Sequence, residues 1–274
     1  MERTVLITGC SSGIGRASAE AFLDEEWTVY ATARNPADIE TLGEREGCRI
    51  GTLDVTDDGD VERVVDRVLD ETGRIDCLVN NAGFGQLGVV EDVTTGAARA
   101  QFDVNVFGPH RLIKAVLPAM RRRENGTIVN VSSVLGRVAV PGTGVYAGSK
   151  FALEGLTDAL RNEVDEYGID VALVEPGPVD SMFEERVADE LDGLDRSGAY
   201  ESLYSLYEDY DAVGGSGVGA VPPERVAEDV LNAASATKPA ARYPVGPVAR
   251  AGEIGRYLPT WLVDGIWSLA RRLG

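Results

Sequence analysis

Lysine, cysteine and histidine are scarce in this sequence of 274 residues. It contains three lysines against 23 arginines, three cysteines and a single histidine. Cys10, Cys48 and Cys77 have neither the spacing of metal ligands nor the even number of a disulfide framework. So little cysteine is typical of a reducing compartment, and we expect a cytoplasmic protein without disulfides or a bound metal.

Long apolar runs are also absent. No run approaches the roughly 18 residues that a membrane-spanning helix needs. The opening MERTVLITG leads straight into a strand-like segment and lacks the apolar region and cleavage site of a signal peptide. We therefore expect a protein that neither spans a membrane nor is secreted.

Positive charge is in short supply as a whole. The 45 acidic and 26 basic residues give a formal net charge of -19. Such a chain repels phosphates, and its basic cluster at 121–123 is typical of a solvated helix end, so we expect no nucleic-acid partner. Abundant carboxylates with few lysines suit a cytoplasm of high salt, where cations screen the repulsion. We therefore hypothesise a halophilic origin.

Short β-rich runs alternate with longer segments of helical periodicity, which predicts repeated βαβ units. Several of the short runs are apolar throughout, as in strands covered by helices on both faces. We predict an α/β fold with one doubly wound domain over residues 1–274 and about seven parallel strands. The predicted strands are 4–8, 28–33, 49–55, 77–81, 126–132, 170–175 and 241–245; the predicted helices are 13–25, 59–72, 96–122, 146–166, 223–236 and 258–272.

Two segments depart from this alternation. Residues 178–222 are acidic and then glycine-rich, and we expect them to form an insertion over the sheet. Tyr200, Leu203, Tyr204 and Tyr207 follow helical spacing there, which fits either packing or a substrate surface. The amphipathic stretch 257–273 fits core packing or subunit contact better than a membrane surface, because the acidic chain would be repelled by anionic lipids.

A glycine-rich turn follows the first predicted strand, in the order Thr8-Gly9-Cys10-Ser11-Ser12-Gly13-Ile14-Gly15. Glycines allow the backbone to turn tightly and to approach a pyrophosphate, and the N-terminus of the following helix attracts its charge. Glycine spacing alone also fits an ordinary tight turn. Its place between the first strand and the first helix favours dinucleotide binding.

The end of the second predicted strand bears on the choice of dinucleotide. An acidic side chain there would bind the adenosine ribose hydroxyls and select NAD. This sequence has Ala33 followed by Arg34, so a cation stands where a 2′-phosphate would lie, with Ser12 as a further donor. We predict a preference for NADP(H), although an arginine could also simply close the strand.

Tyr146 and Lys150 lie four residues apart at the start of the clearest predicted helix, and therefore on one helical face. With this number of tyrosines and lysines, about 0.1 such Tyr-x-x-x-Lys pairs are expected by chance in the whole sequence. An ammonium about 4 Å from the phenol would lower the pKa of the tyrosine from about 10 towards 7, which suits a proton donor and acceptor. A plain surface pair is the alternative.

Six ordered motifs together resemble the short-chain dehydrogenase/reductase family, in particular its hydroxysteroid and retinol dehydrogenase branch. The motifs are Thr8-Gly9-x-x-x-Gly13-Ile14-Gly15, Asn80-Asn81-Ala82-Gly83, Asn105, Ser133, Tyr146-x-x-x-Lys150 and Pro176-Gly177. The match covers residues 4 to about 181. It implies a Rossmann fold, and a homodimer or homotetramer formed through the predicted helices 96–122 and 146–166.

The resemblance also implies roles for four catalytic residues. Tyr146 would exchange a proton with the carbonyl or hydroxyl oxygen of the substrate, and Ser133 would donate a hydrogen bond to the same oxygen. Lys150 would favour the tyrosinate and hold the nicotinamide ribose, and Asn105 would fix a water that links Lys150 to solvent. The hydride chemistry would belong to the cofactor.

Further positions are implied as cofactor contacts. Ser181 replaces the threonine that is usual after the Pro-Gly pair, but it keeps a hydroxyl group. The complete set of expected cofactor contacts is Gly9, Ser11, Ser12, Gly13, Ile14, Gly15, Arg34, Asp54, Val55, Asn81, Ala82, Gly83, Tyr146, Lys150, Pro176, Gly177, Val179 and Ser181.

We accordingly predict an NADP(H)-dependent oxidoreductase that interconverts a small hydrophobic secondary alcohol and its ketone. A catalytically silent NADP-sensing protein is the first alternative, although the presence of all four catalytic residue types argues against it. A dinucleotide-using epimerase or dehydratase is the second. Turnover of NADPH would separate the oxidoreductase from the silent protein, and a reaction without net redox change would indicate the epimerase or dehydratase.

Overall fold

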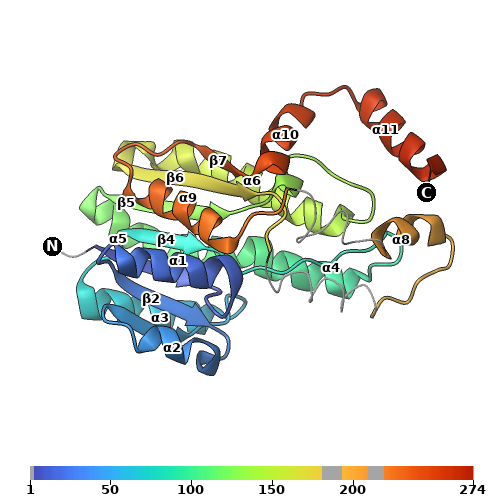
Figure 1. Ribbon diagram of the computed structural model, residues 1–274. Helices are drawn as coiled ribbons and strands as arrows, with labels where there is room; N and C mark the ends of the chain where they lie inside the picture. The colour runs from blue at the N-terminus through green and yellow to red at the C-terminus, as the bar shows by residue number, and fades with distance from the viewer. Residues whose placement is uncertain (1–2, 181–192, 209–218, 274) are drawn as a thin grey trace.

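Seven parallel strands form one sheet in the computed structural model, which describes residues 3–180, 193–208 and 219–273 (Figure 1). The spatial order is β3-β2-β1-β4-β5-β6-β7, so the order reverses between β1 and β4. Every neighbouring pair of these strands is parallel. The strands are β1 (Thr4–Thr8), β2 (Thr28–Ala33), β3 (Cys48–Thr52), β4 (Cys77–Asn80), β5 (Gly126–Val131), β6 (Ile169–Pro176) and β7 (Arg242–Val245).

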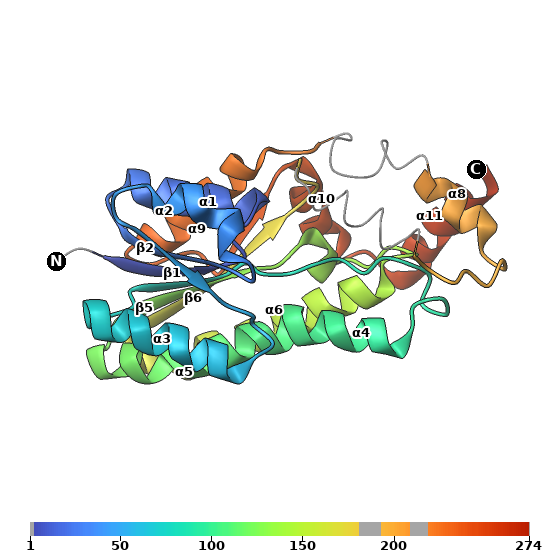
Figure 2. The ribbon, with the colours of Figure 1, turned by 90° about the horizontal axis from the view of Figure 1, so that it is seen from below.

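Helices cover both faces of the sheet, as Figure 2 shows. One face carries α1 (Gly13–Asp24), α2 (Glu40–Gly43) and α9 (Pro223–Ser235), and the other carries α3 (Asp58–Thr72), α4 (Thr95–Phe102), α5 (Gly108–Arg123) and α6 (Gly144–Val164). Beyond the carboxyl ends of the strands lie α8 (Glu201–Glu208), α10 (Pro247–Gly255) and α11 (Thr260–Leu273). Short turns η1 (Pro36–Ile39), η3 (Val134–Gly136) and η4 (Asp165–Tyr167) connect elements. The predicted doubly wound architecture is confirmed.

The two helical layers enclose two apolar cores. Ile7 packs in a core with Phe22 of α1 and Val230 of α9. Its neighbour Leu6 packs in the opposite core with Leu112 of α5. Successive residues of a strand point to opposite faces of a sheet, so a strand between two helical layers is apolar on both faces over most of its length.

The predicted helix over 96–122 is wrong as a continuous α-helix. A π-helical turn, η2 (Asp103–Phe107), separates α4 from α5, and the N–H of Gly108 bonds to the carbonyl oxygen of Asp103. Pro109 has no N–H to continue an α-helical ladder, and it lies instead in the first turn of α5, where that N–H is not needed. The wide turn carries Asn105.

The other predicted elements match the structure with shifts of at most three residues at their ends, and the bounds of β1 and β2 match those predicted. The sequence did not indicate η1, α2 and α10, because these helices are too short to show a clear periodicity. The helical spacing from Tyr200 to Tyr207 coincides with α8. Of the predicted insertion 178–222, residues 181–192 and 209–218 lie outside the described part of the chain.

The C-terminal helix α11 exposes several apolar side chains. Trp261 is 73% exposed, and Ile266 and Leu269 are exposed as well. The described part of this helix therefore does not join the core of its own chain, which was one of the two packing alternatives. Among the described residues, none of the helices combines the length and the apolar character needed to cross a bilayer.

Candidate active site

The glycine-rich turn lies between β1 and α1, at the carboxyl edge of the sheet where the strand order reverses. In open α/β sheets this crevice is where ligands bind. Gly9 and Gly13 have φ values of 74° and 54°, in the left-handed region that glycine adopts easily. A Cβ atom on Gly15 would lie 2.2 Å from the carbonyl oxygen of Gly9. The turn is therefore closed so tightly that only glycine fits.

Thr8 and Asn81 hold this turn. The Thr8 hydroxyl accepts hydrogen bonds from the backbone N–H groups of Asn81 and Ala82, both at 3.0 Å. The Asn81 side-chain amide donates to the carbonyl oxygens of Thr8, at 2.9 Å, and Gly9, at 3.1 Å. Asn81 and Ala82 therefore support the backbone of the glycine turn, and Thr8 does so too, a role that the sequence did not indicate.

An open pocket of about 400 Å³ lies beside the glycine turn at the end of β2. Its lining residues are Ser11, Ala33, Arg34, Asn35 and Asp38. Arg34 is exposed there. Asp38 accepts a hydrogen bond from the Asn35 side chain, 2.9 Å between Nδ2 and Oδ1. The pocket thus contains the arginine that the sequence suggested for a 2′-phosphate, while Ser11, rather than Ser12, is the serine that lines it.

Asp54 and Val55 follow β3. The Asp54 carboxylate accepts hydrogen bonds from the backbone N–H and the hydroxyl of Thr56, at 2.9 and 2.7 Å. Val55 is buried and packs where a Cβ on Gly108 would lie, 2.8 Å from its Cγ2. Asp54 is therefore oriented by its own loop, and Val55 packs against the start of α5.

Tyr146 and Lys150 lie on the first two turns of α6 and are 7% and 6% exposed. The Lys150 Nζ is 5.8 Å from the centre of the Tyr146 ring. The same ammonium donates a hydrogen bond to the carbonyl oxygen of Val131, at 3.0 Å. Burial lowers the pKa of Lys150 to about 8, and the charge of Glu154 acts in the opposite direction. The pair therefore converges, and the lysine is held by the end of β5.

Ser133 follows β5 and precedes η3, so it reaches the same edge of the sheet as Lys150. Its hydroxyl oxygen accepts a hydrogen bond from the backbone N–H of Leu135, at 3.1 Å. This contact fixes the oxygen and leaves its own hydrogen available for another acceptor.

Asn105 is 1% exposed, in the π-helical turn η2. Its carbonyl oxygen accepts from the N–H of Phe84 at 3.1 Å, and its amide donates to the carbonyl oxygen of Phe84 at 2.9 Å and to the Ser149 hydroxyl at 3.1 Å. Ser149 in turn donates to the carbonyl oxygen of Tyr146, at 2.7 Å. Asn105 therefore links the loop after β4 to α6, and π-helical turns are frequent at functional sites. Gly83 lies against Asn105, since a Cβ atom on Gly83 would be 3.1 Å from the Asn105 Oδ1.

The Pro176-Gly177 pair ends β6 at the same edge. Gly177 lies against α10, because a Cβ on it would be 3.2 Å from the Cβ of Val248. Val179 forms a parallel bridge with Val221. The expected contact Ser181 lies outside the described residues.

The described part of the insertion is anchored to the segment after β4. The Tyr204 hydroxyl, at the buried side of α8, donates to Asp92 Oδ2 at 2.8 Å and accepts from the N–H of Val89 at 3.2 Å. Tyr200 donates to Glu91. These tyrosines of the predicted aromatic stripe thus make structural contacts; the side chain of Tyr207 lies outside the description.

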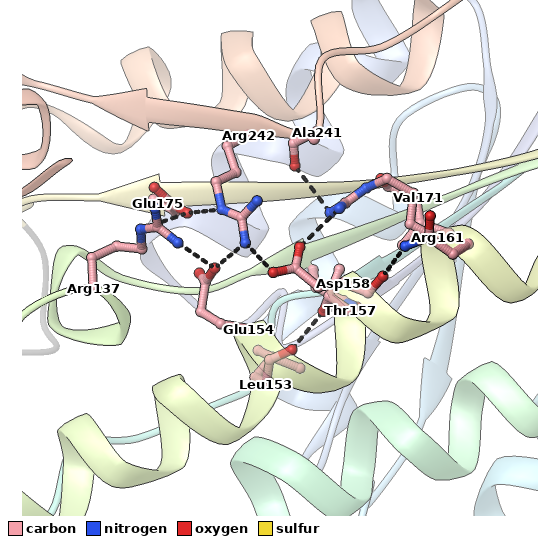
Figure 3. A network of polar contacts seen from close by, with 12 residues as sticks. Arg137, Leu153, Glu154, Thr157, Asp158, Arg161, Val171, Glu175, Ala241 and Arg242 are labelled. Carbon is pink, nitrogen blue, oxygen red and sulfur yellow. Dashed lines mark hydrogen bonds and ion pairs between the residues drawn. The ribbon is translucent and has the colours of Figure 1, made fainter. Parts of the chain in front are cut away.

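A buried group of charged residues beside Lys150 was not found from the sequence. It consists of Arg137, Glu154, Glu175 and Arg242, which we call the buried ion cluster (Figure 3). The four residues come from four segments up to 105 positions apart, so no local motif indicates them. The available signal was Glu154, which stands four residues after Lys150 and hence on the same helical face.

Comparison with known proteins identifies relatives over most of the chain. An uncharacterized oxidoreductase of Escherichia coli, YbbO, is 37% identical, with 97% of this chain and 94% of the relative aligned. The 3-ketodihydrosphingosine reductase of Bacteroides thetaiotaomicron is 34% identical over 98% and 96% of the two chains. Human retinol dehydrogenase 8 is 36% identical over 88% and 80%.

Solved structures with a similar fold belong to the same kind of protein. A short-chain dehydrogenase from Streptomyces avermitilis has a TM-score of 0.82 and 33% identity, with 99% and 98% of the chains covered. A Burkholderia cenocepacia short-chain dehydrogenase in complex with NADP has a TM-score of 0.77 and 25% identity, with 96% of each chain covered. The sequence model of the short chain dehydrogenase family matches residues 3–192. This chain is therefore an oxidoreductase that belongs to the short-chain dehydrogenase/reductase family.

Proposed function

We propose that this protein is an NADP(H)-dependent oxidoreductase that interconverts a hydrophobic secondary alcohol and its ketone, with Tyr146 as general acid and base. The observation that carries the proposal is the convergence of Tyr146 with the buried ammonium of Lys150. Ser133, which follows the end of β5, lies at the same edge of the sheet. The glycine turn lies at the same edge.

The chain's own residues fit a dinucleotide. The glycine turn excludes a side chain at Gly15, which lets the backbone come close to a pyrophosphate. Ser12 precedes α1 without capping it, so the first N–H groups of that helix remain for an anion. In this proposal, Lys150 and the loop after Pro176 would hold the nicotinamide end. When bound, the nicotinamide supplies or accepts the hydride.

The preference for NADP(H) rests on the pocket at the end of β2. An arginine lines this pocket and no carboxylate stands at the strand end itself, so a 2′-phosphate would gain a charge-assisted hydrogen bond from Arg34. The solved relative from Burkholderia cenocepacia binds NADP. A family member from Burkholderia phymatum, in complex with NAD, has the same fold with a TM-score of 0.75 and 24% identity, with 88% of each chain covered.

The proton chemistry follows from the positions of three side chains. In the direction of reduction, the Tyr146 hydroxyl donates its proton to the substrate oxygen, and in oxidation the phenolate removes it. The positive charge of Lys150 stabilises the phenolate. Ser133 donates a hydrogen bond to the same substrate oxygen, where negative charge develops.

The hydrophobic substrate class is supported by the relatives, which are named for a retinol and for a ketodihydrosphingosine. A homodimer or homotetramer through α4, α5 and α6 is part of the proposal. The exposed Phe107 and Phe151 on these helical segments support it.

A substrate panel tests the proposal. Steroids, retinoids, acyl ketones and sugars are supplied with NADPH or NADH in high salt, and absorbance of the reduced cofactor is followed. We expect oxidation of NADPH with an apolar ketone and little activity with sugars. Binding of NADPH without turnover of any compound would favour the silent sensor, and conversion without net redox change would favour an epimerase or dehydratase.

A further inference from the structure

The buried ion cluster joins α6 to β6, to β7 and to the residue after η3, as Figure 3 shows. Arg242 of β7 lies 3.1 Å from Glu154 of α6 and 3.0 Å from Glu175 of β6, measured between nitrogen and oxygen. Arg137, just after η3, lies 3.8 Å from Glu154 and 3.9 Å from Glu175. Glu154 and Glu175 are only 4% and 1% exposed. Desolvation of a charged carboxylate is costly, so buried carboxylates are retained only where partners compensate that cost.

The two carboxyl groups differ in their contacts. Burial, followed by the charge of Glu154, raises the pKa of Glu175. The carboxylate of Glu154 accepts a hydrogen bond from the Arg242 side chain, 3.1 Å between Nη2 and Oε2. Glu154 lies one helical turn beyond Lys150, on the same face of α6.

Glu154 and Lys150 meet around Gly136. A Cβ on this glycine would lie 3.0 Å from Glu154 Cγ, 3.3 Å from Lys150 Cβ and 2.8 Å from Ser132 Oγ. The two charged side chains are thus packed against the same backbone position, with no space between them and η3 for a methyl group. Since η3 follows Ser133, the contact also fixes the segment that presents the catalytic serine.

The charged and titratable groups around this contact come from every element packed there. They are Tyr146 and Lys150 on α6 beside Glu154 itself, Arg137 after η3, Glu175 on β6 and Arg242 on β7; Asp158, on the next turn of α6, binds Arg242 on its outer side at 2.6 Å. The two arginines stabilise the acids. Among the described residues, Glu154 is the group whose charge supports the ammonium of Lys150 against burial.

We propose that Glu154 is a positioning residue for the reaction at Tyr146: its carboxylate, held by Arg242, keeps the buried ammonium of Lys150 charged so that it can stabilise the phenolate. The role of Lys150 rests on the function proposed above. The charge on Lys150 does not, and it can be measured without substrate.

The test uses the small number of lysines. The full-length protein is labelled with ¹³Cε-lysine, which gives three NMR signals; the exposed Lys114 and Lys238 are assigned with Lys114→Arg and Lys238→Arg. The Lys150 signal of the unmodified protein should titrate near pH 8. In Glu154→Gln its midpoint should fall by about one pH unit, because an anion is removed from a poorly solvated cation.

Asp158→Asn is the matched control. It makes the same acid-to-amide change in another partner of Arg242, at 2.6 Å, but further along α6 from Lys150. Its Lys150 midpoint should stay within about 0.3 pH units of the unmodified protein. Glu154→Asp, which keeps the charge, should restore most of the midpoint lost in Glu154→Gln.

Two results overturn the proposal. One is an equal Lys150 midpoint in Glu154→Gln and the unmodified protein. The other, which needs no variant and therefore survives a failure of Glu154→Gln to fold, is a Lys150 that is already neutral at pH 7. Where an alcohol substrate is found, the rise of its oxidation rate with pH should also move to higher pH in Glu154→Gln, a change that a loss of stability alone would not produce.

Discussion

The ammonium of Lys150 lies 5.8 Å from the centre of the Tyr146 ring while it donates a hydrogen bond to the carbonyl oxygen of Val131. One cation therefore joins α6 to the end of β5. Burial of both side chains makes this interaction stronger than the same pair would have in water.

Replacement of Tyr146 by phenylalanine removes the proton donor and leaves the ring in place. We expect kcat to fall by about 10²- to 10⁴-fold, as for the loss of a general acid. Binding of NADPH, measured by fluorescence, should change little. Tyr167→Phe, in η4 just beyond the C-terminal end of α6, is the control and should keep full activity. Activity surviving Tyr146→Phe nearly intact would defeat the mechanism.

Arg34→Ala tests the choice of cofactor. A charge-assisted hydrogen bond contributes about 1.5–3 kcal/mol, so the variant should bind NADPH about ten- to hundredfold more weakly while its affinity for NADH is unchanged. Arg45→Ala is the control, because Arg45 is also exposed but lies before β3, at the opposite edge of the sheet, where it pairs with Asp24 at 2.7 Å. Tighter binding of NADH than of NADPH by the unmodified protein would refute the assignment.

Gly15→Ala and Gly155→Ala compare two helical glycines. A methyl group at Gly15 would meet the carbonyl oxygen of Gly9, whereas nothing lies within 4 Å of a Cβ on Gly155. We expect Gly15→Ala to cost about 1–3 kcal/mol of stability and to weaken dinucleotide binding. Gly155→Ala should instead stabilise the protein by about 0.5–1 kcal/mol. Thermal melts and NADPH titrations measure both, and an unaffected Gly15→Ala would contradict the tight turn.

The buried Cys10 thiol is expected to make the free energy of unfolding fall as the pH rises into the alkaline range. Burial raises its pKa to about 12, whereas a thiol in the unfolded chain ionises at about 8.5. The folded state therefore holds the proton longer, and this contribution is complete below about pH 8.5 and is lost as pH rises towards 12. It amounts to at most about 1.4 kcal/mol per pH unit. Urea unfolding at pH 8 and pH 10 should show a smaller loss in Cys10→Ala, and equal losses would argue against it.

Salt should control stability as a whole. With 45 acidic and 26 basic residues, the folded chain repels itself unless cations screen the charge. If the hypothesis of a halophilic origin holds, the melting temperature should drop by several degrees on transfer from molar to millimolar KCl. A melting temperature that is the same at both concentrations would count against it.

The candidate site was largely predictable because its residues lie in local motifs. The spacing of Tyr146 and Lys150 already placed both on one helical face, and the glycine turn followed directly from β1. Neither the break at Asn105 nor its bonds to Phe84 and Ser149 could be predicted, since they depend on how a π-helical turn meets another loop.

By itself, the sequence determined the alternation of strands and helices, the strands that are apolar on both faces, and the order of the motifs of the candidate site. Each of these depends on neighbours within a few residues. Only the tertiary structure decided which distant charges share a buried space. Glu154, Glu175 and Arg242 approach one another only after β6, β7 and α6 have packed, and the low dielectric of that packed region is what makes their charges matter to Lys150.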